Sequence, residues 1–262
     1  MLFLDAIVSA ATLGSTDAVA ILLQVVNDPS IYTDAFNAMT ASGELWLDNY
    51  YFSLVEALLS RGTADEGVHS ALVTAIGYVI QGVASPELLE LLLSHDADVN
   101  FDHGKALQLV AESAREDLLE MLLRKNPSSH SIYMSLQTAL RIGHEEEIVF
   151  HFFMSATENE FVQEKLDVNN YSVLGYPLLF YCLNNYPASD RLARKICELN
   201  ADLSATLDWD MFENEYDEPL SDGLTPLLIA LEKDCSDDVI GVLLDHGGEF
   251  GEIFTNNLPC PC

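Results

Sequence analysis

The sequence predicts an all-α fold in which short helix-turn-helix units are stacked along the chain. Three observations lead to this prediction. One stretch near the C-terminal end reads as such a unit, and paired large apolar residues recur along the chain at a roughly regular spacing. In addition, 49% of the 262 residues are hydrophobic, which is enough to build a large core.

The clearest unit runs from Asp222 to Gly247, with the sequence DGLTPLLIALEKDCSDDVIGVLLDHG. Thr225 is suited to cap the first helix, and Pro226 to occupy its first position. After a break at Asp234 to Ser236, a second helix is predicted over Asp237 to Asp245, ended by the glycine. Apolar residues cover more than one face of each helix, so the unit needs neighbours on both sides.

Similar units are predicted along the whole chain. Large apolar pairs near the end of each second helix recur at steps that mostly fit a repeat of about 33 residues, and insertions account for the longer steps. The pairs are Leu22-Leu23, Leu58-Leu59, Leu92-Leu93, Leu122-Leu123, Phe152-Phe153, Ile196-Cys197 and Leu243-Leu244. We predict one domain over residues 1–254 with copies at about 1–29, 31–63, 66–100, 101–129, 131–165, 172–203 and 220–254, an acidic insert at 204–222 and a C-terminal tail at 255–262.

Several of these segments resemble the ankyrin repeat family. The match is most specific in DGLTPLLIA with VLLDHG, in LLSHDADVN (Leu92 to Asn100), in GHEEEIV (Gly143 to Val149) and in LNADL (Leu199 to Leu203). Copies four and five are similar to the degenerate arrays of filamentous-fungal ankyrin proteins. The last copy keeps the Thr-Pro of the family's Thr-Pro-Leu-His start but has Leu228 in place of His. The resemblance implies an ankyrin-type solenoid of about seven repeats that binds a protein partner on its concave face and fingers.

The family's variable positions supply a set of candidate partner contacts. Each pair follows the apolar core of a first helix and is expected to face away from the layer of second helices. Carried over by the resemblance, the candidates are Thr12 and Leu13, Glu112 and Ser113, Arg141 and Ile142, Leu183 and Asn184, and Glu232 and Lys233.

The acidic insert adds three aromatic candidates, Trp209, Phe212 and Tyr216, which are interleaved with carboxylates. Large apolar side chains in a loop need a surface that covers them. Two interpretations stay open: the insert folds over its own stack as a lid beside the basic group at residues 191–195, or it is an arm that binds a partner. The spacing of its acids does not fit a twelve-residue calcium loop, so we predict no metal site.

The charge balance narrows the classes of partner. The chain has 42 acidic and 11 basic residues, a formal net charge of −31, which disfavours direct binding to nucleic acid and to anionic membranes. Solubility is the simplest explanation of the acidity, and a basic protein partner is the alternative. The apolar N-terminal start lacks the basic region of a signal peptide, and five cysteines without regular spacing fit reduced thiols. We therefore expect a cytoplasmic location, with the nucleus as the alternative.

The sequence does not contain a Gly-rich phosphate loop, a Gly-x-Ser-x-Gly elbow or a His-Glu-x-x-His helix. We accordingly expect no catalytic residue and no cofactor. The predicted function is a non-enzymatic, monomeric scaffold for protein-protein interaction. An acidic charge mimic that occupies the nucleic-acid site of a basic protein is the alternative, and an enzyme is a more remote one.

Overall fold

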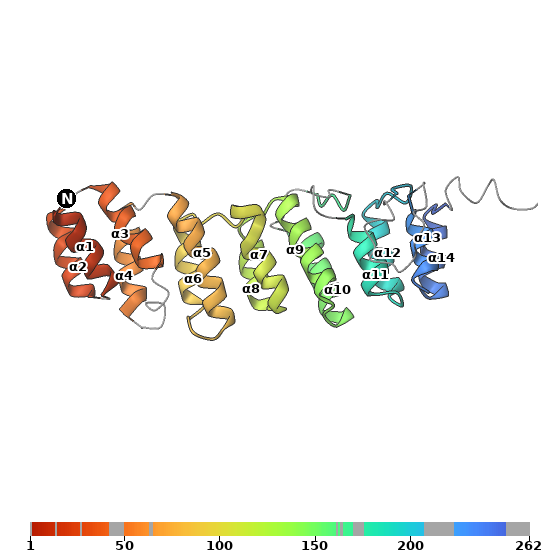
Figure 1. Ribbon diagram of the computed structural model, residues 1–262, viewed down its shortest axis with the longest axis horizontal. Coiled ribbons are helices and arrows are strands. Elements are labelled where there is room, and N and C mark those ends of the chain that lie inside the picture. Colours follow the sequence, from red (N-terminus) through yellow and green to blue (C-terminus); the bar gives the residue numbers. More distant parts are fainter. Residues whose placement is uncertain are drawn as a thin grey trace, which may run out of the picture. The chain divides into compact units, whose positions relative to one another are not determined.

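A computed structural model of the chain describes residues 2–13, 15–26, 28–41, 50–62, 65–160, 162, 165–169, 176–206 and 223–249. The regular elements in these segments are α-helices, which confirms the all-α class (Figure 1). None of them is long and apolar enough to cross a membrane. The helices are α1 (Leu2–Thr12), α2 (Thr16–Val25), α3 (Pro29–Ala41), α4 (Tyr50–Leu59), α5 (Asp65–Ile80), α6 (Glu87–Ser94), α7 (Phe101–Ser113), α8 (Glu116–Leu123), α9 (Ser129–Ile142), α10 (Glu146–Glu158), α11 (Leu178–Asn185), α12 (Asp190–Glu198), α13 (Pro226–Glu232) and α14 (Asp237–Asp245).

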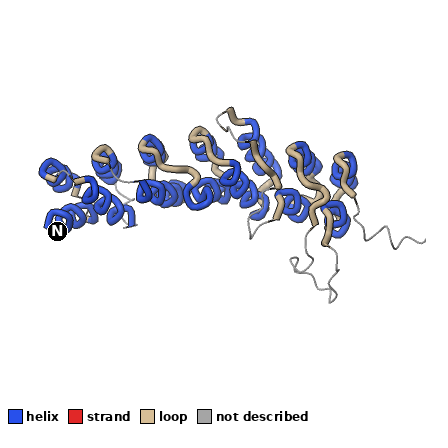
Figure 2. Tube along the Cα trace, turned by 90° about the horizontal axis from the view of Figure 1, so that it is seen from above, coloured by secondary structure: helices blue, strands red, loops and turns tan. Residues whose placement is uncertain are grey.

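The chain forms two compact units, unit 1 (Met1–Ser131) and unit 2 (Ile132–Cys262), with the boundary inside α9. In unit 1, each odd-numbered helix packs against the even-numbered helix that follows it, from α1 with α2 to α7 with α8. The odd-numbered helices also pack in succession, α1 on α3, α3 on α5 and α5 on α7, and α2 packs against α4. Unit 1 therefore consists of four helical hairpins arranged in two rows, which are visible in Figure 2.

Unit 2 uses the same arrangement. Helices α11 and α12 form one packed pair, and α13 and α14 form the next. Across the pairs, α11 contacts α13, whereas α12 contacts both α10 and α14. Odd-numbered and even-numbered helices thus occupy separate layers within this unit as well.

The even-numbered helices form because their apolar residues recur at helical spacing. In α6, Leu88, Leu89, Leu92 and Leu93 are buried, whereas Glu90 is exposed. The predicted apolar pairs are buried from the second copy to the sixth. In the last pair Leu243 is buried, whereas Leu244 is 49% exposed.

The last hairpin matches its predicted caps. The Thr225 hydroxyl accepts a hydrogen bond from the Leu228 amide at 3.4 Å, and Pro226 begins α13. Ser236 caps α14 in the same way through the Val239 amide, at 3.3 Å. These caps confirm the predicted starts of both helices.

A recurring turn that the sequence reasoning missed links even-numbered helices to the odd-numbered helices that follow. In each case an aspartate Oδ1 accepts a hydrogen bond from the amide two residues later, at 2.8–3.0 Å. These pairs are Asp28 with Ser30, Asp98 with Asn100, Asp167 with Asn169, and Asp202 with Ser204. They recur at roughly 35 residues or twice that distance, so the Asp-x-Asn/Ser motif marks a structural period.

Two of these turns also hydrogen-bond to the next turn in their own unit. In unit 1, Asn100 Oδ1 accepts from the Ser128 amide at 2.7 Å. In unit 2, Asn169 Oδ1 accepts from the Asp202 amide and Asn169 Nδ2 donates to the Asn200 carbonyl, both at 2.8 Å. Each asparagine thereby satisfies backbone groups that belong to a neighbouring connection.

Helix α7 starts with an unusual left-handed turn. Asp102, His103 and Gly104 have φ angles of 50°, 57° and 72°. A Cβ atom on Gly104 would lie 2.5 Å from the Ser131 Cβ and 2.9 Å from its Cα. This position therefore requires glycine both for its backbone conformation and for its lack of a side chain.

Candidate protein-interaction surface

The candidate contact pairs predicted from the resemblance lie at equivalent places, at or next to the C-terminal ends of α1, α7, α9, α11 and α13. In unit 2 these ends are adjacent. Asn185 Nδ2 on α11 donates to the Leu140 carbonyl of α9 at 2.9 Å, and Cys235 Sγ, just after α13, donates to the Leu183 carbonyl at 3.6 Å. The structure thus brings the three predicted pairs of unit 2 into one row.

The two predicted pairs of unit 1 do not meet in this way. Thr12 and Leu13 lie at the end of α1, whereas Glu112 and Ser113 lie at the end of α7. Helices α3 and α5 separate them, because contacts run from α1 to α3, from α3 to α5 and from α5 to α7. A partner that covers only a small area of unit 1 would therefore not contact both pairs.

Most of the predicted residues of unit 2 are accessible. Arg141, Asn184 and Glu232 are exposed, Ile142 is 40% exposed and Lys233 is half-buried. Leu183 is a correction, because its side chain is 0% exposed and belongs to the core of unit 2. It cannot contact a partner while α11 is packed.

The aromatic candidates of the insert, Trp209, Phe212 and Tyr216, lie outside the described residues. The choice between a lid and a partner-binding arm therefore stays a prediction.

Two tyrosines and a glutamine that the sequence reasoning missed lie beside the predicted residues. Gln137 Nε2 on α9 donates to the hydroxyl oxygen of Tyr181 on α11 at 3.0 Å. The rings of Tyr176 and Tyr181 lie 5.6 Å apart at an angle of 57°, and both residues are half-buried. Burial, with a smaller contribution from Tyr181, raises the pKa of Tyr176, so this phenol stays neutral at physiological pH.

We use the name α9–α11 face for the accessible residues Arg141, Tyr181 and Asn184 together with Gln137, which is only 8% exposed and supports Tyr181 by its hydrogen bond. Gln137 and Arg141 are four residues apart on α9, and Tyr181 and Asn184 are three apart on α11, so each pair shares a helix face. The hydrogen bond from Gln137 to Tyr181 joins the two pairs. The result is a surface of amide, phenol and guanidinium groups.

Charge is segregated between the two layers of unit 2. Helices α9, α11 and α13 contain a single base, Arg141, and a single acid, Glu232. The acids of the even-numbered helices α10, α12 and α14 are Glu146, Glu147, Glu158, Asp190, Glu198, Asp237, Asp238 and Asp245. The strongly acidic composition of the chain therefore does not extend to the α9–α11 face.

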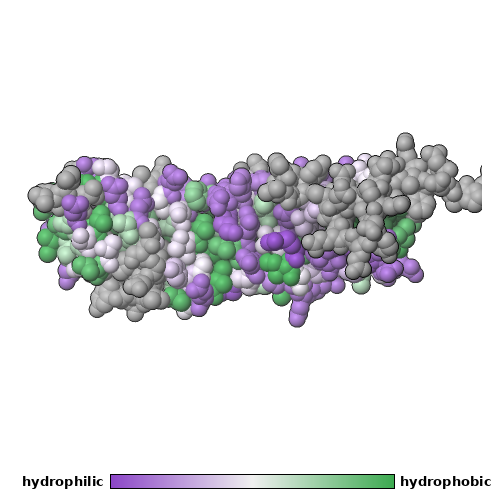
Figure 3. All heavy atoms as spheres, in the orientation of Figure 1, coloured by the Kyte–Doolittle hydropathy of each residue, from purple (hydrophilic) through white to green (hydrophobic). Residues whose placement is uncertain are grey.

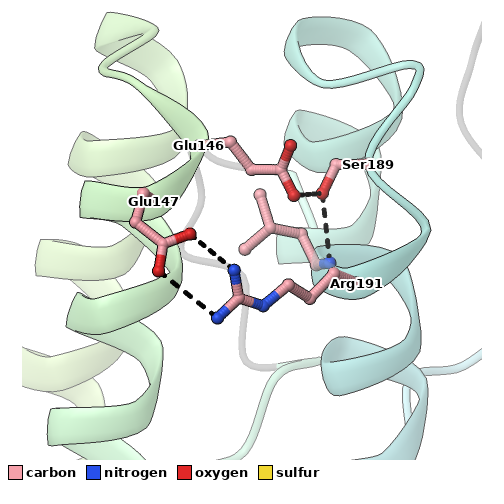
Figure 4. Close-up of polar contacts among 5 residues, drawn as sticks. Glu146, Glu147, Ser189 and Arg191 are labelled. Atoms are coloured by element: carbon pink, nitrogen blue, oxygen red, sulfur yellow. Dashed lines mark hydrogen bonds and ion pairs between the residues drawn. The ribbon is translucent and has the colours of Figure 1, made fainter.

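The basic group at residues 191–195 is engaged with acids of helices α10 and α12. Arg191 Nη1 lies 2.5 Å from Glu147 Oε2 (Figure 4). The Arg191 guanidinium also lies over the Phe150 ring, 3.6 Å from its centroid. Lys195 Nζ lies 2.9 Å from Glu158, and Arg194 lies 3.7 Å from Asp190 within α12. The sequence reasoning placed this group beside the acidic insert and missed these helix partners.

A partly buried hydrogen bond accompanies these exposed ion pairs. Ser189 caps α12, accepting from the Leu192 amide at 3.2 Å, and donates its own hydroxyl proton to Glu146 Oε1 at 2.6 Å (Figure 4). Exposed ion pairs such as Arg191 with Glu147 contribute only about 0–1 kcal/mol each. The Ser189 hydrogen bond and the stacking of Arg191 on Phe150 add to the contact between α10 and α12. This cluster joins α10 to α12 and stabilises unit 2.

The described residues contain no group of three or more His, Cys, Asp or Glu side chains that could hold a metal ion. Their three cysteines, Cys182, Cys197 and Cys235, are buried and free. Burial raises the pKa of Cys197 and of Cys235 to about 11 and raises that of Cys182 as well. At neutral pH all three are protonated thiols, which are poor nucleophiles.

We therefore expect these three thiols to resist iodoacetamide at pH 8.5 in the folded protein and to react rapidly in urea, where thiols ionise near pH 8.5. Because the folded pKa values are raised, their contribution to stability is complete below about pH 8.5 and is lost as the pH rises toward 11. Mass mapping of alkylated cysteines and urea titrations at pH 7.5 and 10 measure both effects. Rapid alkylation of Cys182 in the native protein would contradict the buried assignment.

In comparisons with known proteins, no protein-family model matches the chain, and no curated protein matches its sequence. The described part of the chain defines an all-helical protein whose second unit presents a largely uncharged amide and aromatic face. Its function is inferred from the arrangement of these residues.

Proposed function

We propose that this chain is a non-enzymatic protein-interaction scaffold, an ankyrin-type helix-turn-helix solenoid whose partner binds the α9–α11 face and the adjacent end of α13. The repeat architecture is supported by the packing of hairpin on hairpin in each unit and by the recurring Asp-x-Asn/Ser turn. In such stacks each repeat contacts only its neighbours, which leaves one layer of helices available to a partner.

The observation that carries the proposal is the composition of the α9–α11 face. Tyrosine and arginine dominate the binding energy of protein interfaces, because they provide large contact areas together with directed hydrogen bonds. Here Arg141, Tyr181 and Asn184 are exposed or half-exposed on neighbouring helices, and Ile142 adds an apolar contact. The hydrogen bond from Gln137 fixes the Tyr181 side chain in advance, which lowers the entropy cost of binding.

A second candidate function is the acidic charge mimic, and the segregation of charge in unit 2 favours it. Helices α10, α12 and α14 contain eight acids and the three bases Arg191, Arg194 and Lys195, so this layer keeps an excess of five acids (eight minus three) that a basic protein would recognise. Binding through this layer depends on long-range attraction and weakens steeply as salt rises, whereas binding through aromatic anchors weakens far less.

The experiment compares two charge reversals of exposed arginines. Arg141→Glu changes the α9–α11 face, whereas Arg124→Glu changes an arginine that follows α8 and is 65% exposed. Proteins retained by the wild-type chain from a lysate of its native cells are identified at low and high salt, and the retained partner is purified. We expect Arg141→Glu to weaken its affinity by roughly 30-fold, the effect of losing about 2 kcal/mol at a hot spot, and Arg124→Glu to leave it unchanged.

Equal affinities for the wild type and Arg141→Glu would contradict the proposed face. Complete loss of the partner at high salt, with both variants still binding at low salt, would favour the charge mimic instead.

A further inference from the structure

Two histidines of unit 1 lie next to each other where one hairpin meets the next. His103 belongs to the first turn of α7, and His130 to the first turn of α9. Their ring centroids lie 5.6 Å apart, and the ring planes form an angle of 75°. His103 is exposed and His130 is half-buried, so solvent reaches the pair. Figure 3 shows hydrophilic atoms on the surface around the start of α7, near the centre of the view.

The ring nitrogens of His103 and His130 have no hydrogen-bond partner among the described residues. Two other histidines differ in this respect. Nδ1 of His69 accepts a hydrogen bond from the Asp98 amide at 3.0 Å, and Nδ1 of His246 lies 2.8 Å from the Val242 carbonyl oxygen. The nitrogens of the His103–His130 pair are therefore available to a ligand.

The separation of the two rings fits a shared metal ion. Zinc–nitrogen bonds of about 2.0–2.1 Å in a tetrahedral arrangement place the centres of two bound imidazole rings about 5 Å apart. The observed separation of 5.6 Å is close to this value. A small rotation of the exposed His103 side chain is enough to bring both rings onto one ion.

Close contacts between the starts of α7 and α9 keep the two histidines together. A Cβ atom on Gly104 would lie 2.5 Å from the Ser131 Cβ, so the backbone of α7 passes directly beside α9. Asn100 Oδ1 accepts a hydrogen bond from the Ser128 amide at 2.7 Å, and the Ser128 and Ser131 hydroxyl oxygens lie 3.0 Å apart. Ligands held in place in this way lose little freedom when a metal ion binds.

His103 is also held in a costly backbone conformation. Its φ of 57° follows a φ of 50° at Asp102, and both values lie in the left-handed region. Side-chain Nε2 of Gln108 donates to the His103 carbonyl at 2.9 Å and supports this turn. Residues with side chains adopt left-handed conformations at a cost in free energy, and such residues cluster at ligand-binding sites.

The surroundings of the pair favour a cation. Asp96, Asp98 and Asp102 in the connection that leads into α7 are exposed, whereas Lys105 is half-buried. The net charge of −31 attracts cations to the whole surface. Imidazole nitrogen prefers transition-metal ions such as Zn²⁺, whereas Ca²⁺ and Mg²⁺ prefer oxygen ligands.

We propose that His103 and His130 bind one divalent transition-metal ion, with Zn²⁺ as the type case and water molecules at the remaining coordination positions. Two protein ligands are fewer than the three or four of resident zinc sites, so the ion exchanges with solution. The bound ion joins the start of α7 to the start of α9. This site lies in unit 1 and does not depend on the proposed partner-binding face. The sequence reasoning predicted no metal site, because histidines 27 residues apart form no local ligand motif.

Titration of the full, isotope-labelled chain with zinc chloride tests the proposal, with the imidazole signals followed by NMR. Thiols that react in the native protein are first blocked with iodoacetamide, because thiolates also bind zinc. We expect the ring signals of His103 and His130 to shift together along one binding curve that saturates. Calcium chloride at the same concentrations is expected to leave these signals unchanged.

The variants His103→Asn and His130→Gln each remove one imidazole. Asparagine tolerates a left-handed backbone and glutamine is a good helix former, so the helix content measured by circular dichroism is expected to stay the same. Each variant is expected to weaken zinc binding at the remaining histidine by about tenfold or more, since even the outer hydrogen-bond partners of metal ligands matter by about 10–100-fold. His151→Gln is the matched control at an exposed histidine on α10 and is expected to leave the binding curve unchanged.

Three results would each overturn the proposal. The first is the absence of any zinc-dependent shift of the two ring signals in the wild-type chain, which needs no variant. The second is an unchanged affinity of His130 for zinc in His103→Asn, because the two rings would then bind independently. The third is an equal shift with calcium chloride, which would assign the cation to the neighbouring carboxylates.

Discussion

Replacing Phe153 by alanine is expected to lower the free energy of unfolding of unit 2 by about 3–5 kcal/mol. The Phe153 side chain is 0% exposed on α10, and truncation removes its buried surface and leaves a cavity that the packed helices fill only in part. Domains are typically stable by only about 5–15 kcal/mol, so this one change removes a large share. Urea titration followed by circular dichroism measures the loss.

Phe52→Ala is the matched control, because Phe52 on α4 is 36% exposed and loses less buried surface. Hydrogen exchange adds a spatial test. In a stack where each hairpin contacts only its neighbours, the Phe153 variant is expected to open α9 to α12 while α1 to α4 keep their protection. Equal losses from the two phenylalanine variants would contradict the core position of Phe153.

Replacing Gly104 by alanine is expected to be the second most damaging change. A left-handed conformation costs a residue with a side chain about 1–2 kcal/mol, and Gly104 has a φ of 72°. The new Cβ would also lie 2.5 Å from the Ser131 side chain and 2.9 Å from its backbone, which adds about 1–3 kcal/mol of overpacking. The sum is large enough to be measured by urea titration of the full chain.

Gly82 provides a control with the same φ of 72° and no atom within 4 Å of the position that a Cβ would take. Gly82→Ala therefore carries the conformational cost without the collision. We expect Gly104→Ala to be more destabilising than Gly82→Ala, and Ser131→Gly to recover part of the difference. Equal effects of the two alanine variants would show that α7 shifts away from Ser131 at no cost.

Local chemistry made much of the fold predictable. The starts of α13 and α14 were predictable because the caps Thr225 and Ser236 hydrogen-bond to amides only three residues later. The buried apolar pairs follow from helical periodicity. Both signals act within one helical turn, so one sequence is enough to detect them.

The candidate surface was harder to predict, because it depends on contacts between distant residues. Gln137 and Tyr181 are 44 residues apart, and no local pattern indicates that their side chains meet. The burial of Leu183 depends on how α11 packs against α13 and Cys235, which shifts the exposed side of α11 to Tyr181 and Asn184. The left-handed turn at Asp102 and His103 was also missed, since glycine at position 104 is its sole local signal.

The segregation of charge in unit 2 has a kinetic consequence. The layer formed by α10, α12 and α14 has five more acids than bases, and its net field turns an approaching charged molecule before any contact is made. The partner proposed for the α9–α11 face, if its charge is uneven, is then expected to arrive with its negative side rotated away from that layer, which shortens the rotational search that normally limits docking to about 10⁵–10⁷ M⁻¹s⁻¹. The acids of one layer would thereby influence how quickly the proposed partner binds the other layer, although they make no contact with it.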